Sequence, residues 1–503
     1  MGNYLSAAEM KRIAPAETAS FRGPMPTQIV SNGEFVPVPQ TREQQRVEAR
    51  VKDLAATLAP RHGMSRRRFL ASSAGMAAAM LAMNEVFGPT FDVSPAEAQV
   101  PGVADARAKE LAGQFIFDCQ THFVRDDYDV APLTQFAQWA KLNGNPDLQG
   151  QFGLTRFKFE NYVKEVFVDS DTKIALLSGT PSDIPEFEAL GNDQILAARD
   201  AINAIAGSRR MLGHAIVKPG QKDWMARVEA AIAAPNRAES WKGYTIGDPF
   251  LAAPASCWRL DDEKLMYPFY QRIRRAGMTT VCVHKGILSA DYARAGSQWV
   301  DIWDYATVWD VARAARDWPD INFVIYHSAA RPVTEKPDAS ILEFAETGRL
   351  RWASDLADIP QQHPVKNVYA EIGTAFATFA VAAPRLAASL LGILIKGMGA
   401  DHVLWGTDSV WYGSPQWQIE AMRRLEIPVE LQKKYGFAPL GPADGPVKRA
   451  ILGENAARLY KLPVNAALGA ISKDTIAAMK AEYVKRGGLR SNARYGYVDP
   501  GTA

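Results

Sequence analysis

Imidazole and carboxylate side chains follow four short apolar runs in the sequence. Neutral imidazole nitrogen and carboxylate oxygen are usual ligands of a divalent metal. One histidine after an apolar run is more often a hydrogen-bonded core residue, but three of the seven histidines share this position. An aspartate in the fourth position would bring a buried charge that a metal compensates. The pattern predicts a metal centre built by His122, His284, His327 and Asp408, which follow the runs at 114–119, 280–283, 322–326 and 403–406.

Short apolar runs alternate with longer helical patterns from residue 114 onward. This alternation is typical of repeated βα units and a parallel sheet. Eight units indicate an α/β fold, a closed (β/α)8 TIM barrel, whereas a Rossmann-like sheet is less favoured because no G-x-G-x-x-G follows the first run. The predicted strands are 114–119, 173–177, 211–217, 243–246, 280–283, 322–326, 367–372 and 403–406, and predicted helices include 194–206, 223–233, 263–276, 305–317, 340–355 and 375–398.

The active site of such a barrel forms where the strands end and the βα loops begin. The four residues above are therefore expected to converge at one end of the barrel. Alternation along the first strand places Gln120 and His122 on one face. His214 lies inside the third run rather than after it, and we expect it to be a core residue.

Other side chains near the predicted strand ends are candidates for substrate contact. Lys285 and Arg331 could pair with a substrate carboxylate, as could Lys218, although a solvated loop charge is the favoured explanation for each of them singly. Trp411 lies in the loop beyond Asp408 and could line a pocket for a planar substrate, with packing as the alternative. Glu371 ends the seventh strand, where it could support the site or form an ordinary loop salt bridge.

The order of these residues resembles the amidohydrolase superfamily. The shared features are D-x-Q-x-H at 118–122, a histidine after the fifth and sixth strands, and G-T-D at 406–408. The stretches N-V-Y-A-E-I-G at 367–373 and L-G-E-N-A-A-R-L at 452–459 resemble the amidohydrolase-related branch. That branch includes aminocarboxymuconate-semialdehyde decarboxylase, resorcylate decarboxylase and lactone or amide hydrolases. The resemblance covers roughly 114–462.

The resemblance implies one divalent metal, zinc first and manganese as the alternative. It implies that His122, His284 and Asp408 hold this metal and that His327 acts beside it as a general acid or base. Gln120 stands where the family usually has a histidine, and its amide oxygen is a weaker candidate ligand. The fourth predicted strand, which ends near 247–248, offers no lysine or glutamate to bridge a second metal, so a mononuclear site is expected.

Three functions are compatible with this site. The first is a hydrolase that uses metal-activated water on a C–O or C–N bond of a small, carboxylated or aromatic substrate, with His327 and Asp408 as catalytic residues. The second is a nonoxidative decarboxylase, a carbon–carbon lyase on the same metal site. The third is a noncatalytic barrel that has lost its metal, which Gln120 suggests.

Residues 65–71 read S-R-R-R-F-L-A and begin a weakly apolar run that extends to 83. This resembles a twin-arginine export signal with Arg66 and Arg67 as its pair, and the bland alternative is a surface alanine helix. The run is too short and too mild for a transmembrane helix, so we expect no stable membrane anchor. A-E-A at 96–98 suits cleavage before Gln99. We predict a periplasmic or secreted protein that meets the twin-arginine translocation machinery.

The predicted organisation has five parts, and the first hundred residues are expected to lie outside the fold. Translation from either Met1 or Met64 is compatible with the sequence, with 1–40 flexible and a charged amphipathic helix at 41–59. Helices at 445–459 and 472–486 should pack outside the barrel. The parts are a partly disordered arm (1–63), the signal segment (64–98), a linker (99–113), the barrel (114–465) and a C-terminal helix and tail (466–503).

Composition bounds the partners. The 57 basic and 55 acidic residues create no overall field that would attract nucleic acid or an anionic membrane. The three cysteines, Cys119, Cys257 and Cys282, predict no disulfide framework. The expected partner is a small-molecule substrate, and a homo-oligomer is also compatible with the sequence.

Overall fold

The structure is a computed structural model of the 503-residue chain. It describes residues 23–29, 31–32, 34–35, 37–128, 142, 157–182, 184–247, 257–287, 302–331 and 339–488.

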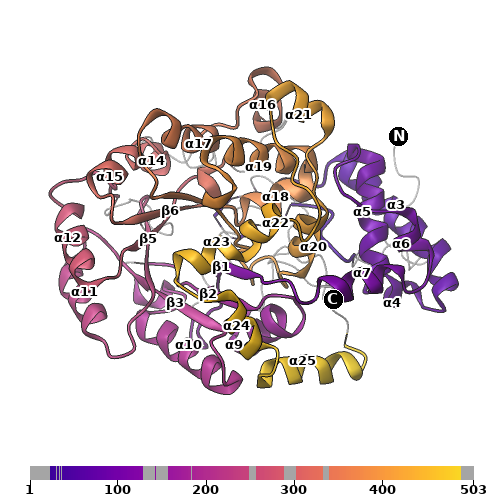
Figure 1. Ribbon diagram of the computed structural model, residues 1–503, viewed down its shortest axis with the longest axis horizontal. Coiled ribbons are helices and arrows are strands. Elements are labelled where there is room, and N and C mark those ends of the chain that lie inside the picture. Colours follow the sequence, from indigo (N-terminus) through magenta and orange to yellow (C-terminus); the bar gives the residue numbers. More distant parts are fainter. Residues whose placement is uncertain are drawn as a thin grey trace.

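Parallel strands form a sheet in the order β1 to β8 within the described residues (Figure 1). The sheet closes on itself, because Cys119 N donates to Trp405 O and Asp408 N donates to Gln120 O, both at 2.9 Å. The predicted (β/α)8 barrel is therefore confirmed. The strands are β1 (Phe117–Thr121), β2 (Ile174–Leu177), β3 (Met211–Ile216), β4 (Ser240–Tyr244), β5 (Thr280–His284), β6 (Asn322–Tyr326), β7 (Val368–Glu371) and β8 (Val403–Leu404).

Helices cover the outside of the barrel, and three predicted helices are split. The one expected at 305–317 falls on the end of a helix at 302–306 and on a second helix at 311–317. The helix expected at 375–398 breaks at Pro384, whose ring cannot continue a preceding helix, and the one expected at 340–355 divides into two. The helices of the barrel layer are α9 (Phe159–Val163), α10 (Asn192–Ala206), α11 (Trp224–Ala233), α12 (Met266–Ala276), α14 (Ile302–Ala306), α15 (Val311–Asp317), α16 (Ala339–Thr347), α17 (Ala353–Gln362), α18 (Ala375–Ala382), α19 (Pro384–Met398), α20 (Gln416–Arg424), α21 (Val429–Tyr435), α22 (Pro446–Arg449) and α23 (Asn455–Leu459).

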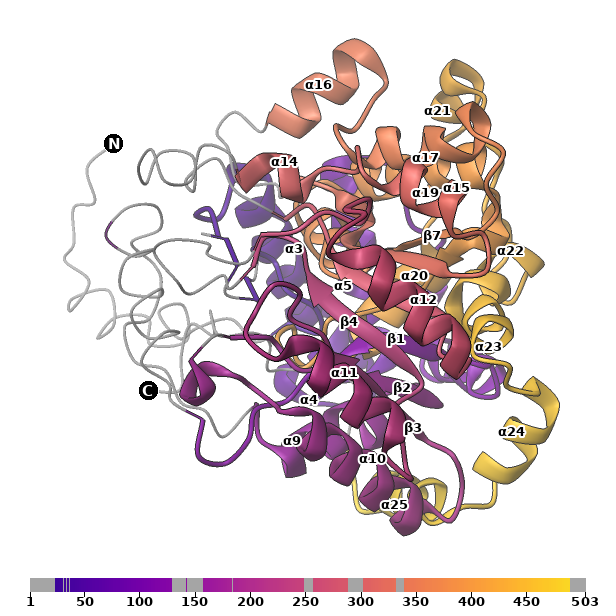
Figure 2. The same cartoon turned by 90° about the vertical axis from the view of Figure 1, so that its left-hand side faces the viewer.

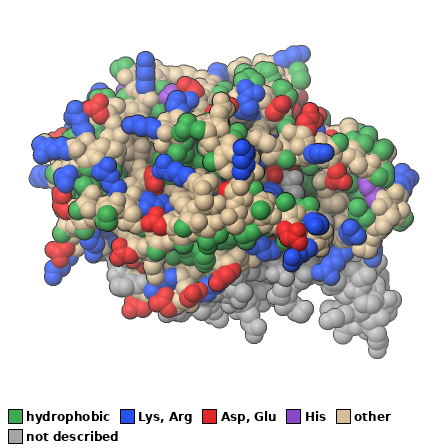
Figure 3. Space-filling model, turned by 60° about the horizontal axis from the view of Figure 1, so that its bottom comes forward, with side chains coloured by type: hydrophobic (Ala, Val, Ile, Leu, Met, Phe, Trp, Pro, Cys, Tyr) green, Lys and Arg blue, Asp and Glu red, His purple; other side chains and the backbone are tan. Residues whose placement is uncertain are grey.

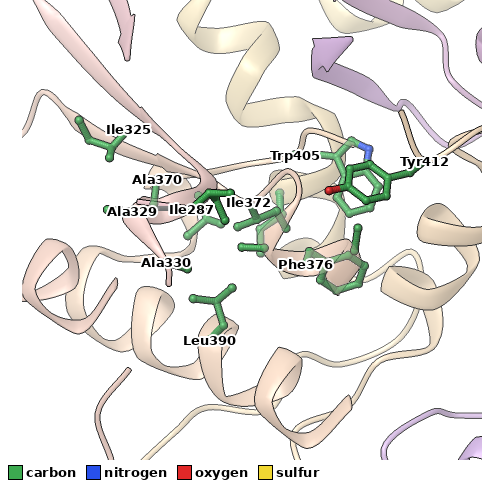
Figure 4. Close-up of a cluster of buried hydrophobic side chains, with 14 of the residues drawn as sticks. Ile287, Ile325, Ala329, Ala330, Ala370, Ile372, Phe376, Leu390, Trp405 and Tyr412 are labelled. Carbon is green, nitrogen blue, oxygen red and sulfur yellow. The ribbon is translucent and has the colours of Figure 1, made fainter. Parts of the chain in front are cut away.

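Alternation along the strands separates two hydrophobic layers. Val324 and Tyr326 of β6 belong to a buried cluster with residues of β1, β2 and β5, and α23 contributes to the same cluster. Ile325 of β6 belongs to the second layer, between strands and outer helices. Figure 4 shows this second layer, with Ile325 and Ala370 from strands and Leu390 from α19. The period of two in strand side chains therefore supplies both the barrel interior and its helical coat.

The fourth strand begins three residues earlier than the predicted run at 243–246. Trp241 pairs with Val281 of β5, and Lys242 pairs with Cys282 in the same register. The earlier start brings Lys242 into the barrel wall, where its side chain is fully buried.

Helices of the N-terminal region pack beside the barrel (Figure 1). The helix α5 lies against α3, α6, α7 and α20, and its Ala77, Ala78 and Met80 are fully buried. The strand-like bridge between Phe91 and Leu425 joins this region to the segment after α20. The helices are α3 (Arg42–Leu58), α4 (Arg66–Leu70), α5 (Ser73–Phe87), α6 (Pro95–Gln99) and α7 (Val103–Leu111).

Two expectations for the N-terminal region are therefore wrong for the described residues. The region does not lie outside the fold. The alanine- and methionine-rich α5 is apolar on several sides, and neighbouring helices cover these sides. The expected flexible arm is also packed, since Met25, Ile29 and Phe35 are buried in the main hydrophobic cluster. The amphipathic helix expected at 41–59 is confirmed as α3.

The helix expected at 472–486 is present as α25 (Thr475–Lys485). The other helix, expected outside the barrel at 445–459, ends in α23, whose Ala456 and Ala457 belong to the interior cluster, and α24 (Val464–Ile471) packs against the same cluster. The C-terminal helices α24 and α25 lie at the opposite end of the molecule from α16 and α21 in both ribbon views (Figures 1 and 2). Acidic and basic side chains are interspersed on the face drawn in Figure 3. None of the helices in the described ranges combines the length and apolar character required to cross a membrane.

Candidate active site

His122 and Asp408 form a buried pair at the carboxyl ends of β1 and β8. His122 Nε2 lies 3.0 Å from Asp408 Oδ1. Asp408 Oδ2 accepts hydrogen bonds from Thr374 Oγ1 at 2.5 Å and from Asn32 Nδ2 at 3.0 Å. Burial by itself would raise the pKa of Asp408, but the hydrogen bond and charge of His122 outweigh it and hold that pKa below its ordinary value. Asp408 is therefore an ionised carboxylate.

His284 and His327 form a second buried pair at the ends of β5 and β6. His327 Nε2 lies 3.0 Å from His284 Nδ1, and His327 Nδ1 lies 2.9 Å from Gly373 O. A carbonyl only accepts, so Nδ1 of His327 carries the proton and its Nε2 presents a lone pair. Burial lowers the pKa of His327 to about 4 and that of His284 well below its ordinary value. Both imidazoles are neutral near pH 7, the state that binds a metal.

Glu371, at the end of β7, holds the backbone around the second pair. Its Oε2 accepts from His327 N at 3.1 Å, and its Oε1 accepts from Gly373 N at 2.6 Å. Burial raises the pKa of Glu371 to about 8. A Cβ at Gly406 would lie 1.8 Å from Glu371 Oε1, so only glycine fits in the G-T-D segment. Glu371 therefore positions His327 rather than forming a loop salt bridge.

Three residues of the site have left-handed backbone conformations. The φ angles are 59° at His327, 55° at Thr374 and 58° at Asp408. Such conformations cost of the order of 1–3 kcal/mol each in residues other than glycine, and they cluster at functional sites. The strain therefore marks the same strand ends that carry the imidazoles and the carboxylate.

Gln120 lies within an irregularity in β1, and His122 follows it. The pairing register with β2 shifts between Asp118 and Thr121, and Thr121 Oγ1 lies 2.9 Å from the hydroxyl of Tyr162 in α9. Such a bulge re-aims the residues around it. Gln120 Oε1 and His122 Nδ1 are buried and have no hydrogen-bond partner among the described residues. A cation or water at the site would satisfy these atoms, so the donor set fits a metal.

Three residues near the site were not predicted from the sequence. Asn32 and Glu34 reach the site from the N-terminal arm, and no sequence motif predicts their role. Glu34 Oε1 lies 3.4 Å from His284 Nδ1, and donor atoms of Glu34, His284 and His327 all lie within 4.8 Å of one another. Burial and the charge of Asp408 raise the pKa of Glu34 to about 8.

The third residue is Lys242, so the expectation of no lysine on the fourth strand is wrong. Its Nζ lies 3.4 Å from the ring centroid of Tyr326 and 5.2 Å from that of Tyr244, with no hydrogen-bond partner among the described residues. Burial lowers the pKa of Lys242 to about 8. The sequence contains this lysine within the run S-W-K-G-Y at 240–244. It was missed because the strand was predicted to begin at 243, whereas β4 begins at Ser240.

Two of the predicted substrate-binding residues, Trp411 and Arg331, lie against aromatic rings. Trp411 is buried beside the site, with its ring centroid 6.0 Å from that of His122 and 5.1 Å from that of Phe157. Arg331 lies over the ring of Trp303 at 5.6 Å. The substrate contacts of Trp411 and Arg331 stay predictions.

The two predicted lysines are paired with carboxylates. Lys285 is fully buried, and its Nζ lies 3.0 Å from Asp310 Oδ1. Lys218 Nζ lies 2.9 Å from Glu188 Oε1. A substrate carboxylate would have to displace these partners, so the role of Lys285 as a substrate ligand also stays a prediction.

His214 is a core residue, as expected. It lies within β3, and its Nε2 is 2.8 Å from the hydroxyl of Tyr326. Its Nδ1 is 2.9 Å from Ser240 Oγ, so both ring nitrogens have partners inside the barrel.

The model of a protein family described as amidohydrolase matches residues 183–462. The match includes His284, His327 and Asp408 and begins after β1. None of the curated proteins matches the chain.

Several solved structures are similar to the chain. An uncharacterised TIM-barrel protein from Bordetella bronchiseptica has 15% identity and a TM-score of 0.41, covering 70% of this chain and 99% of its own. The 5-carboxyvanillate decarboxylase from Sphingomonas paucimobilis has 14% identity and a TM-score of 0.40, covering 70% and 100%. The 2,6-dihydroxybenzoate decarboxylase from Rhizobium has 14% identity and a TM-score of 0.35, covering 69% and 99%.

Proposed function

Because the chain belongs to the amidohydrolase family and is an enzyme of that family, we propose that it is a metal-dependent hydrolase. Its substrate is a small, carboxylated or aromatic molecule with a C–O or C–N bond to be cleaved. The observation that carries the proposal is the position of two buried pairs, His122 with Asp408 and His284 with His327, at the carboxyl ends of the strands. Active sites of (β/α)8 barrels form at this end.

The residues that would hold the metal are His122, His284 and Asp408, with Gln120 as a weaker oxygen donor. The neutral imidazole of His284, the ionised carboxylate of Asp408 and two unsatisfied buried atoms support this assignment. The donors suit zinc, and the oxygen of Gln120 also suits manganese. A divalent ion bound there supplies Lewis-acid catalysis and lowers the pKa of water.

Two side chains would manage protons. Asp408 is ionised and can accept a proton from the attacking water. The Nε2 lone pair of His327 can accept a proton and later deliver it to the leaving group, while Gly373 O keeps the ring oriented. This division of roles requires only water as the second reactant.

A nonoxidative decarboxylase is the second candidate, and Lys242 is the observation that favours it. Its buried ammonium has no hydrogen-bond partner among the described residues and could attract a substrate carboxylate. Hydrolysis is preferred because it requires only metal-activated water as the second reactant.

The test is incubation of the metal-loaded protein with lactones, amides and aromatic acids, followed by ring opening, amine release and carbon dioxide release. We expect hydrolysis that Asp408→Asn abolishes and that Lys242→Met retains. Carbon dioxide release without hydrolysis, lost in Lys242→Met, would establish the decarboxylase instead. Elemental analysis of the untagged protein tests the noncatalytic alternative, which requires that no divalent metal is bound.

We also propose that the chain is exported to the periplasm or secreted through the twin-arginine machinery. Arg66 and Arg67 are exposed at the start of α4, where a receptor could reach them. Changing both to lysine should retain the protein in the cytoplasm. The matched control changes Arg42 and Arg46, two exposed arginines of α3, to lysine and should leave export unchanged. Unchanged export of the first variant would exclude this route.

A further inference from the structure

Two residues of the N-terminal arm contact the candidate metal site. Glu34 Oε1 lies 3.4 Å from His284 Nδ1, and the side chain of Glu34 is 18% exposed. Donor atoms of Glu34, His284 and His327 lie within 4.8 Å of one another, so Glu34 can reach a cation that is held at His284. The arm therefore adds a carboxyl oxygen donor to a site otherwise built from the barrel.

Asn32 links this carboxylate to the carboxylate of the barrel. Its Nδ2 donates to Glu34 Oε2 at 2.5 Å and to Asp408 Oδ2 at 3.0 Å. Two carboxylates that share one neutral amide repel each other unless a cation or a proton lies between them. The neighbouring neutral imidazoles of His284 and His327 make a metal cation the better counter-charge.

The arm is held in place by contacts outside the site. Met25, Ile29 and Phe35 are buried in the main hydrophobic cluster. Thr27 Oγ1 donates to Glu48 Oε2 of α3 at 3.0 Å, so the arm is tied to the N-terminal helices. The approach of Glu34 to His284 is therefore part of a packed structure.

We propose that Glu34 is a metal ligand supplied by the N-terminal arm. The inference rests on the proposed metal-dependent function. The barrel offers an amide at Gln120 where an imidazole would bind more tightly, and Glu34 adds a carboxyl oxygen to that weakened set. A chain that begins at Met64, or that is cleaved before Gln99, lacks this ligand.

The experiment titrates the full-length apo-protein with Mn²⁺ and follows the free ion by electron paramagnetic resonance. Glu34→Gln should weaken binding ~10-fold or more, the scale of changes around a bound metal. Glu34→Asp, which keeps the charge and shortens the reach, should fall between wild type and Glu34→Gln. Glu43→Gln makes the same chemical change at an exposed position near the start of α3 and should bind as wild type does. Circular dichroism and thermal unfolding of each apo-protein check that the fold is kept.

His284→Ala separates the failure of this inference from the failure of the proposed function. If wild type binds Mn²⁺, His284→Ala loses it and Glu34→Gln binds equally well, Glu34 is not a ligand and the metal site stands. If Glu34→Gln binds more tightly than wild type, the arm obstructs the metal and the inference is overturned. If wild type binds no Mn²⁺ or Zn²⁺ at micromolar concentration, the proposed metal-dependent function fails as well.

Discussion

At the scale of single residues, burial and hydrogen bonding set the protonation of the site. His327 is neutral because burial lowers its pKa, and its tautomer follows from the carbonyl of Gly373. Asp408 stays ionised despite burial because His122, Thr374 and Asn32 surround its oxygens. These protonation states support the proposed roles of Asp408 as metal ligand and base and of His327 as proton carrier.

His327→Asn should abolish turnover while metal content stays near that of wild type, if His327 transfers protons and does not bind the metal. Asparagine keeps a polar side chain but cannot exchange a proton near pH 7. Elemental analysis and activity are measured on the same preparations, with His363→Asn, a half-exposed histidine, as the control. A parallel loss of metal would place His327 among the ligands, beside His284.

Gln120→His should tighten zinc binding by ~10-fold or more if Gln120 coordinates the metal, because imidazole nitrogen is the stronger donor. If Gln120 only hydrogen-bonds substrate or water, Gln120→Ala should keep the metal content and lower activity. Zinc titration of the apo-forms of wild type and both variants decides between these roles. Loss of zinc affinity in Gln120→His would show that the position has no room for a ligand imidazole.

At the scale of elements, an irregular strand precedes a site residue, and a helix cap outside the barrel anchors a C-terminal helix. The register of β1 shifts between Asp118 and Thr121, just before His122, which pairs with Asp408. At the outside of the barrel, Asp474 caps α25 by accepting from Ala477 N at 2.7 Å. The same carboxylate accepts from Arg210 Nε at 2.6 Å and from Nη2 at 2.9 Å, which anchors α25 next to β3.

Asp474→Asn should lower the free energy of unfolding by about 3–5 kcal/mol, the cost of breaking a buried ion pair. The amide can still cap α25, but the guanidinium of Arg210, only 5% exposed, is left with an uncompensated charge. Urea unfolding measures the loss, and Asp444→Asn at an exposed position serves as the control. Equal stabilities of wild type and Asp474→Asn would show that the pair is not stabilising.

The stability supplied by Asp474 should depend on pH. Burial would raise its pKa, but hydrogen bonds from Arg210 and Ser208 outweigh it and lower the pKa below the ordinary value. The contribution is therefore fully present above the unfolded-state pKa of about 3.9 and is lost as pH falls through the lower pKa of the folded state. The difference in unfolding free energy between wild type and Asp474→Asn should shrink in acid. A difference that grows as pH falls would contradict this sign.

At the scale of the whole molecule, the N-terminal helices and the barrel form one packed structure. The A-E-A segment at 96–98 lies in α6, and Ala98 is fully buried. Glu97 Oε2 lies 2.7 Å from Arg424 Nη1 of α20, and Glu97 Oε1 lies 3.2 Å from Arg107 Nη1. A peptidase needs an accessible, extended segment, which this helix does not offer.

The folded protein should therefore keep its N-terminal region when exposed to signal peptidase. Intact mass spectrometry is expected to give 55.1 kDa, the mass of the whole chain. The control is the same chain unfolded in urea and added to the peptidase after dilution. It tests whether the peptidase recognises the A-E-A segment when that segment is accessible. Loss of residues 1–98 from the native protein would contradict the buried position of Ala98 and would also remove Glu34.

The sequence by itself predicted the barrel, which is confirmed, and four candidate site residues at strand ends. Strand periodicity is a local property, and parallel strands of a barrel end on one side, so His122, His284, His327 and Asp408 could be placed before any contact was known. Pro384 is a local signal for the start of a new helix. The continuous apolar pattern nevertheless led to the prediction of one helix at 375–398, which missed this break.

Only the tertiary structure decided which distant groups join the site and which segments are covered. Asn32 meets Asp408 across 376 positions of the chain, and no local pattern encodes such a contact. Lys242 depended on the register between β4 and its neighbours, which side-chain pairing sets. An alanine- and methionine-rich run has the same composition in an export signal and in a buried helix, so composition does not distinguish the two. The contacts of α5 with α3, α7 and α20 show that it is a buried helix.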